Sequence, residues 1–297
     1  MSKDTLGLGR GSRRHFLREG MMLTALGACE RFRAEAPGGA PIAKIGLVTD
    51  LHYADKAPAG TRYYRQSVGK LREAGLMFER AKVSRVVELG DFVDAADSVS
   101  EELRYLERIQ SEFSRLPGKK HYVLGNHCVD TLTKAEFLSG VGMEDSFLSF
   151  DESGFHFVIL DACFRNDGEP YGRRNFQWTD PNIPPSQVEW LEADLRSTSK
   201  PTIVFVHQRL DVGEPYGVKN AKAINRLLQA SGQVIAVFQG HSHENDYRCL
   251  QGIHYVTLVA MVEGQGPARN GYAVMNLYEG GRIAITGGGE QKNYSWA

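Results

Sequence analysis

The segment Ala43-Lys44-Ile45-Gly46-Leu47-Val48-Thr49-Asp50-Leu51-His52 runs from a short apolar stretch directly into an aspartate and a histidine. Its first six residues predict a buried β-strand, because short apolar and β-branched runs are typical of strands that are covered on both faces. Three later segments have the same strand-like character: residues 83–89, 202–206 and 234–238. Apolar residues at helical spacing follow the first two strands. We therefore expect one α/β domain over residues 42–297, in which strands and helices alternate.

The remaining elements follow from the same patterns. Helices are expected over residues 64–81, 101–113, 186–196 and 219–230 and near Ala135, and a further strand over residues 122–124. Residues 147–160 are typical of a hairpin that turns at Glu152-Ser153-Gly154, and β-hairpins with glycine turns are expected from Tyr247 onward.

The composition supports a globular protein with a sizeable core. The chain has 297 residues, of which 42% are hydrophobic and 24% charged, and this balance excludes a disordered or collagen-like chain. The formal net charge is −1, so the chain lacks the basic excess that is typical of nucleic-acid binding. Its four cysteines include no C-x-x-C pair that would indicate a zinc site.

Residues 1–36 differ from the rest of the chain, with seven Lys and Arg against four Asp and Glu. The adjacent Arg13 and Arg14 precede an uncharged run over residues 20–29, an order that is typical of a secretory leader. The arginine pair resembles a twin-arginine export signal. We expect export to the periplasm or the cell envelope; the alternative interpretation is a basic tail on a cytoplasmic protein.

Two cleavage sites are open for this leader. Leu26-Gly27-Ala28-Cys29 resembles a lipobox, in which Cys29 would carry a lipid and become the mature N-terminus. The alternative is a cut after Ala34-Glu35-Ala36. Membrane contact is expected only through a lipid on Cys29.

Polar clusters stand where five apolar strands end. They are Thr49-Asp50-Leu51-His52, Gly90-Asp91-Phe92-Val93-Asp94, Gly125-Asn126-His127, His207 and Gly240-His241-Ser242-His243. Because ligands of open α/β sheets bind at the carboxyl ends of strands, we expect these loops to converge. One such residue alone is more often a cap or a satisfied polar group, but eight coinciding residues indicate a site. Imidazole with carboxylate favours first-row transition metals over calcium.

These motifs, in this order, resemble the calcineurin-like metallophosphoesterase family, whose pattern is D-x-H, G-D-x-x-D, G-N-H-D/E, a lone His and G-H-x-H. The resemblance extends essentially from Ile42 to the C-terminus. It implies a four-layer αββα sandwich, in which two mixed β-sheets pack together and helices cover their outer faces. It also implies two divalent transition-metal ions, with Mn as the expected metal and Fe or Zn as alternatives.

The family pattern implies a role for each residue. One ion is expected to take Asp50, His52 and His243, and the other Asn126, His207 and His241, with Asp91 bridging both. Asp94 is expected to act as a cap or hydrogen-bond partner outside the ligand set. The implied chemistry is attack of a metal-bridging hydroxide on a phosphoryl group, with His127 donating a hydrogen bond or proton to the departing oxygen.

Cys128 departs from the family pattern, which usually has Asp or Glu after G-N-H. A catalytic thiol at this position would lack an independent base, so we expect Cys128 to stand beside the site without reacting. Because an ordinary thiol is neutral near pH 7, the charged form of His127 is expected to be less favoured here than beside a carboxylate.

A narrower resemblance concerns the manganese-dependent ADP-ribose/CDP-alcohol diphosphatases. Gly60-Thr61-Arg62-Tyr63-Tyr64-Arg65 resembles one of their segments, and residues 185–191 resemble their S-x-x-Q-x-x-W-L helix. Arg62, Arg65 and Tyr63 are therefore candidate substrate contacts, since guanidinium groups suit phosphate and a tyrosine ring can stack on a base. That subgroup often has Gln in place of His52 and Glu in place of Cys128.

The resemblance implies a dinuclear-metal hydrolase of phosphoesters or phosphoanhydrides, with ADP-ribose or CDP-alcohols as candidate substrates. Its partner would be a small phosphorylated molecule and not a nucleic acid. The alternative is an exported phosphomonoesterase or cyclic-nucleotide phosphodiesterase, which the leader favours because ADP-ribose is mainly an intracellular metabolite. A non-catalytic scaffold with the same fold is the third hypothesis, and the intact ligand set argues against it.

Overall fold

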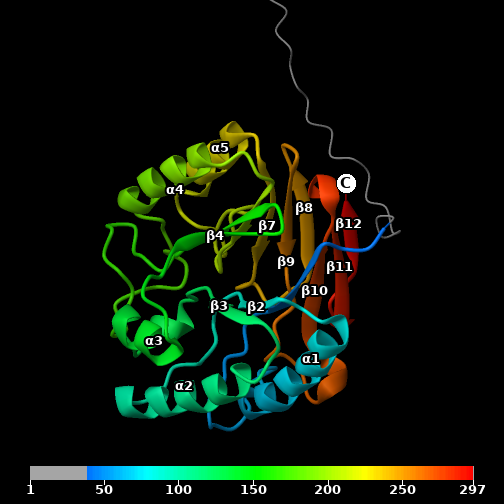
Figure 1. Cartoon of the computed structure of the whole chain (residues 1–297). Helices are drawn as coiled ribbons and strands as arrows, with labels where there is room; N and C mark the ends of the chain where they lie inside the picture. Colours follow the sequence, from blue (N-terminus) through cyan, green and yellow to red (C-terminus); the bar gives the residue numbers. More distant parts are fainter. Residues whose placement is uncertain (1–38, 297) are drawn as a thin grey trace, which may run out of the picture.

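In a computed structural model, which describes residues 39–296, two six-stranded β-sheets pack between two groups of helices (Figure 1). The strands of the first sheet, in spatial order, are β12 (Tyr294–Trp296), β11 (Ile283–Gly289), β10 (Gly271–Leu277), β1 (Ala43–Val48), β2 (Arg85–Glu88) and β3 (Lys119–Tyr122). Those of the second sheet are β4 (Leu148–Glu152), β5 (Phe155–Ile159), β6 (Thr202–Phe205), β7 (Val234–Gln239), β9 (Ile253–Thr257) and β8 (Asp246–Leu250). The helices are α1 (Ser67–Ala81), α2 (Val99–Phe113), α3 (Lys134–Val141), α4 (Pro185–Ser197) and α5 (Ala221–Ser231).

Both sheets are mixed. Strands β1, β2 and β3 run parallel to one another, as do β5, β6, β7 and β9, whereas β4, β8, β10, β11 and β12 pair antiparallel with their neighbours. Parallel strands need crossover connections, and here helices supply most of them, as the alternating pattern of the sequence predicts.

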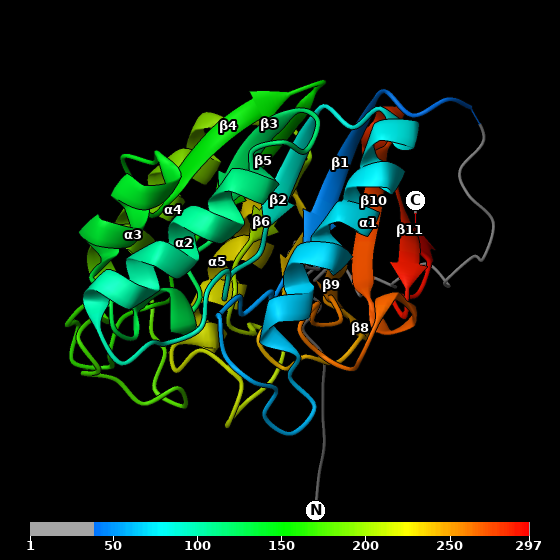
Figure 2. The ribbon, with the colours of Figure 1, turned by 90° about the horizontal axis from the view of Figure 1, so that it is seen from below.

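Three separate hydrophobic cores account for four layers. Helices α1, α2 and α3 cover the outer face of the first sheet, α4 and α5 cover that of the second, and the inner faces of the sheets pack on each other (Figures 1 and 2). Side chains alternate along β1 accordingly: Ile45 and Leu47 lie between the sheets, and Val48 belongs to the core beneath the helices. The predicted αββα sandwich is confirmed.

Local sequence signals explain where two of the helices begin. The Ser98 hydroxyl accepts the Glu101 N–H at the start of α2, at 3.3 Å. Thr133 and Glu136 form a reciprocal capping box at the start of α3, which ends at Gly142 in the left-handed conformation.

One predicted strand is displaced. The strand expected over residues 122–124 lies at Lys119–Tyr122, because its register pairs Lys119 with Arg85 of β2. β3 is the edge strand of its sheet, where lysines are common because they discourage pairing with another chain. Lys119 and Lys120 interrupt the apolar pattern, so the sequence did not indicate that the strand begins there.

The predicted leader and its lipobox lie outside the described residues. Among residues 39–296, no helix combines the length and the apolar character that a membrane span requires.

Candidate metal centre

The polar clusters meet at one edge of the sandwich, where strands of both sheets end. Strands β1, β2 and β3 bring Asp50, His52, Asp91 and Asn126 from the first sheet, and β6 and β7 bring His207, His241 and His243 from the second. All seven side chains are buried or nearly so; His243 is the most open, with 15% of its side chain exposed. Burying this many polar groups costs free energy unless each one finds a partner.

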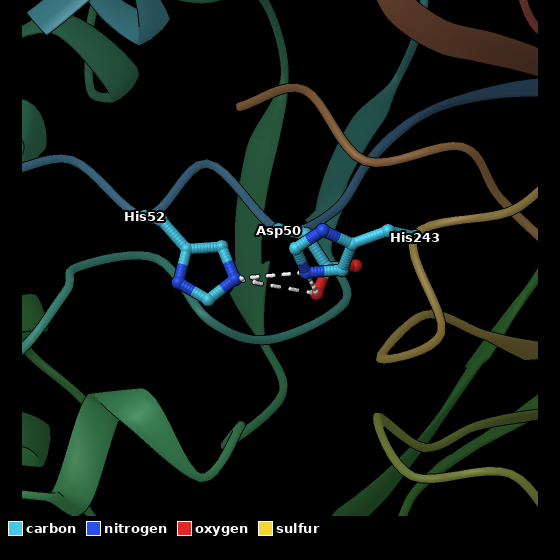
Figure 3. Close-up of side chains that lie close together, drawn as sticks. All are labelled: Asp50, His52 and His243. Atoms are coloured by element: carbon cyan, nitrogen blue, oxygen red, sulfur yellow. Dashed lines mark hydrogen bonds and ion pairs between the residues drawn. The ribbon is translucent and has the colours of Figure 1, made fainter. Parts of the chain in front are cut away.

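The first ligand group consists of Asp50, His52 and His243 (Figure 3). The Nε2 atoms of the two histidines are 3.2 Å apart, and they lie 3.7 and 3.4 Å from Asp50 Oδ1. Three donor atoms at these separations can bind one metal ion between them.

The second ligand group consists of Asp91, His207 and His241, whose donor atoms lie within 4.8 Å of one another. Asp91 Oδ2 is 3.1 Å from His207 Nε2 and 3.5 Å from His52 Nε2 of the first group. Asp91 therefore stands between the two groups, at the position predicted for a bridging ligand. Asn126 is adjacent, because the next residue, His127, donates its N–H to Asp91 Oδ1 at 2.8 Å.

The unpaired atoms of the cluster show what it can bind. Asp50 Oδ1, Asn126 Oδ1, His207 Nε2 and His241 Nε2 are buried and have no hydrogen-bond partner in the described part of the chain. Buried polar atoms rarely remain without a partner, so their presence together indicates a ligand. Carboxylate, amide and imidazole donors fit divalent transition-metal ions.

In four of the ligands, the atom that does not face the cluster is held by a neighbour. The Nδ1 atoms of His207, His243 and His52 face the Leu89 carbonyl at 2.9 Å, Glu263 Oε1 at 2.6 Å and Asp94 Oδ1 at 3.1 Å. A proton on Nδ1 leaves the lone pair of Nε2 free for a metal. Thr49 donates to Asp50 Oδ2 at 2.7 Å, which likewise leaves Oδ1 free.

The backbone at the cluster is strained. Asp50, His52, Asp91, His241 and His243 have φ values of 51°, 41°, 58°, 69° and 61°. Residues other than glycine rarely adopt this left-handed conformation, and such strain persists where the surrounding structure requires it. Gly90 and Gly125 permit the close packing: a Cβ on Gly90 would lie 2.4 Å from His207 Nδ1, and one on Gly125 would lie 2.2 Å from Asp91 Oδ1.

His127, the predicted proton donor, lies at the border of the cluster with 26% of its side chain exposed. Its Nδ1 is 2.6 Å from Asp94 Oδ1, and its ring meets that of His52 edge-on. Burial opposes the charged form of His127, but the negative charges of Asp91 and Asp94 outweigh burial and raise its pKa. Lys56 donates to the other oxygen of Asp94.

The expectation that Cys128 leaves the charged form of His127 less favoured than a carboxylate at this position would stays a prediction, although Asp94 brings a carboxylate to His127 from another part of the chain. The Cys128 thiol is fully buried and accepts the Phe92 N–H at 3.3 Å. Burial, reinforced by the nearby charges of Glu88 and Asp91, raises the pKa of this thiol well above its usual value, so it stays neutral. Asp94 itself lies outside both ligand groups, as expected, yet it contacts two of the histidines.

The candidate substrate contacts differ in their positions. Arg62 reaches toward the cluster, with Nη1 4.0 Å from Asp94 Oδ1. Arg65 instead pairs with Asp55 at 2.5 Å on the exposed surface, and Tyr63 is half-buried and donates its N–H to the Val262 carbonyl. A role for these two residues stays a prediction.

Two exposed aromatic residues beside the cluster escaped the sequence analysis. Trp178 and Tyr216 are 44% and 39% exposed, and the ring centroid of each lies 5.9 Å from that of His241. Both lie in long loops, before α4 and before α5, where no periodicity marks a residue as functional.

Comparison with known proteins identifies the family. The family model described as calcineurin-like phosphoesterase matches residues 43–245. The chain belongs to this family. Membership makes the protein a metal-dependent phosphoester hydrolase with divalent metal ions as cofactors, and the corresponding predictions are confirmed.

Curated relatives of this chain have a more specific name than the family. The manganese-dependent ADP-ribose/CDP-alcohol diphosphatase of Xenopus laevis is 26% identical over 312 positions, which cover 80% of this chain and 86% of the relative. The protein of the same name from Danio rerio is 26% identical and covers 84% of this chain and 96% of the relative.

Solved structures share the fold of this calcineurin-like phosphoesterase. A dimetal phosphatase from Danio rerio superimposes with a TM-score of 0.76 at 22% identity, covering 86% of this chain and 99% of that one. A purple acid phosphatase from yellow lupin superimposes with a TM-score of 0.57 at 15% identity, covering 87% of this chain and 54% of that one.

Proposed function

We propose that the protein is a dinuclear-metal phosphohydrolase that cleaves the diphosphate link of ADP-ribose or CDP-alcohol type molecules, with Mn²⁺ as its metal. The observation that carries this proposal is the pair of ligand groups joined at Asp91, with buried donor atoms that lack partners. Asp50, His52 and His243 would hold one ion, and Asn126, His207 and His241 the other, with Asp91 shared. Such ions act as Lewis acids toward phosphoryl oxygens and lower the pKa of water.

The chain's own residues would bind and orient the substrate around this centre. His127, whose pKa is raised by the negative charges of Asp91 and Asp94, would donate its proton to the departing oxygen. Arg62, a third exposed, would bind the phosphate that does not react, because guanidinium pairs well with phosphate oxygens. Trp178 and Tyr216 would offer an aromatic surface for a nucleobase.

Two observations support a diphosphate substrate. The curated relatives that match over most of this chain are named diphosphatases of ADP-ribose and CDP-alcohols. In addition, the segment over residues 60–65, which resembles one of theirs, delivers Arg62 to the cluster.

A substrate panel tests the proposal. With Mn²⁺, kcat/KM for ADP-ribose or CDP-choline should exceed that for p-nitrophenyl phosphate and cyclic AMP by at least about tenfold, and chelation should abolish every activity. A preference for the monoester or for cyclic AMP would instead favour the alternative hypothesis. Absence of all hydrolysis with metal present would favour the scaffold.

We also propose that residues 1–36 direct export of the protein. The support is the order of signals in the sequence: the Arg13-Arg14 pair, the uncharged run and Cys29. Replacing both arginines by lysine should trap the precursor in the cytoplasm, and Cys29→Ala should release the exported protein from membranes if the lipobox is used. Unchanged fractionation of both variants would support the cytoplasmic reading.

A further inference from the structure

Lys70, in the first turn of α1, is a buried lysine that lies outside both ligand groups; only 2% of it is exposed. Its ammonium nitrogen lies within hydrogen-bond distance of four backbone carbonyl oxygens, which share its three N–H groups: those of Met261 at 2.8 Å, Glu263 at 2.6 Å, Gly264 at 2.9 Å and Arg269 at 3.3 Å. Burial lowers the pKa of Lys70 to about 8, which still leaves the ammonium charged at pH 7. A buried cation inside a ring of carbonyl oxygens resembles the way proteins bind K⁺.

The segment that Lys70 holds, residues 261–270, runs beside the first ligand group. Met261 and Val262 donate their N–H groups to the carbonyls of Thr49 and Asp50, at 3.1 and 3.0 Å. The next residue, Glu263, holds Nδ1 of the ligand His243 at 2.6 Å. Lys70 thus bonds to the backbone of the residue whose carboxylate orients His243.

The same segment also supports the loop that carries Arg62. Gly264 donates to the Thr61 carbonyl at 2.8 Å, and Arg62 forms a backbone bridge with Glu263. Any movement of residues 263 and 264 would therefore displace both a ligand's hydrogen-bond partner and the candidate phosphate-binding arginine.

Helix α1 and the turn before it hold the segment at three points. Gln66, Lys70 and Glu73 recur at the spacing that places side chains on one face of a helix. Gln66 Oε1 accepts the Gly266 N–H at 2.7 Å, and Glu73 accepts from Asn270 Nδ2 at 2.9 Å. Lys70 alone among these three bonds to Glu263, so the other two provide matched controls.

We propose that Lys70 is a positioning residue for the first metal ion: its ammonium serves as a built-in monovalent cation that draws carbonyl oxygens together and so fixes Glu263 against His243. Without the positive charge of Lys70, the clustered carbonyl dipoles repel one another and lose their hydrogen-bond donor. Residues 261–270 then move away from α1. His243 then loses the hydrogen bond that fixes its tautomer, and outer partners of this kind typically contribute tenfold or more to metal affinity. The inference rests on the two-ion site of the proposed function, but not on the identity of the substrate.

Metal affinity of the two sites tests the proposal directly. Mn²⁺ per chain is measured by mass spectrometry over a series of buffered free Mn²⁺ concentrations. We expect Lys70→Met to lower the affinity for one of the two Mn²⁺ ions at least about tenfold and to leave the affinity for the other within about twofold of the wild type. Glu263→Gln should lower the affinity for the same ion, whereas Glu73→Gln should bind both ions with wild-type affinity. Two ions with wild-type affinity in Lys70→Met would overturn the proposal.

Rescue by small cations separates a positioning role from a merely structural one. In Lys70→Ala the truncated side chain leaves room among the carbonyl oxygens, so K⁺ or NH₄⁺ should restore the weakened Mn²⁺ affinity, and choline should not. If the affinity is not restored, or if the variant does not fold with either cation, the proposal fails. A wild-type protein that binds fewer than two ions would contradict the proposed function instead.

Discussion

Asp94 serves two histidines that have different tasks. Its Oδ1 is 3.1 Å from Nδ1 of His52, which leaves the other nitrogen of that ring for a metal, and 2.6 Å from Nδ1 of His127, where it favours the charged form of that ring. Burial raises the pKa of Asp94, but the hydrogen bonds from both histidines and the positive charge of His127 outweigh burial and hold that pKa well below its usual value, so Asp94 carries its negative charge at any pH near neutral.

Asp94→Asn should move the pH profile of the enzyme. The negative charge of Asp94 raises the pKa of His127, so its removal lowers that pKa, and the protonated donor is lost at a lower pH. We expect the alkaline limb of kcat/KM for an alkyl phosphoester to shift down by roughly one unit, and by less for a nitrophenyl ester, whose departure needs little protonation. Cys128→Ala, next to His127 in sequence, is the control and should not shift the limb. Superimposable profiles of Asp94→Asn and wild type would show that His127 is not the donor.

At the scale of elements, the first turn of α2 contains a buried acid with an incomplete set of partners. Glu102 Oε2 accepts the Ala96 N–H at 2.9 Å, two residues after Asp94, whereas Oε1 is buried and has no partner among the described residues. Burial raises the pKa of Glu102 to about 7. The folded protein therefore retains a proton on Glu102 at a pH where the unfolded chain has lost it.

This raised pKa predicts a specific pH dependence of stability. Between about pH 4.5 and 7 the folded state binds more protons than the unfolded state, so the free energy of unfolding falls as the pH rises, by about 3 kcal/mol for this group. Glu102→Gln should remove this slope. Urea unfolding of both proteins at pH 5 and pH 8 measures it, and an equal change in the two proteins would contradict the assignment.

The elements themselves could largely be predicted, because apolar periodicity reports burial in a layered α/β fold. The five polar clusters could be predicted as one site for the same reason, since each follows a buried strand. The roles of Asp94, Glu263 and Lys70 could not be predicted, because each residue acts through a contact with a residue far away in the sequence. β3 was displaced because pairing with β2 set its register, which no local pattern records.

At the scale of the whole molecule, the packing of two sheets creates the centre. Neither sheet carries a complete set of ligands: Asp50, His52, Asp91 and Asn126 come from the first, and His207, His241 and His243 from the second. Both ligand groups combine residues of both sheets, so bound metal ions join the two halves of the sandwich. Metal removal should accordingly lower the melting temperature as well as abolish turnover, since a ligand that binds only the folded state stabilises it.

If two metal ions share Asp91, replacing this residue by asparagine must change the metal content of the protein, which can be measured for the wild type and for Asp91→Asn. After equilibration with Mn²⁺ and removal of free metal, we predict two ions per wild-type chain, and at most one per chain in Asp91→Asn with turnover reduced at least about a hundredfold, because the neutral amide removes the negative charge between two cations. Two ions and wild-type turnover in Asp91→Asn would contradict a shared Asp91.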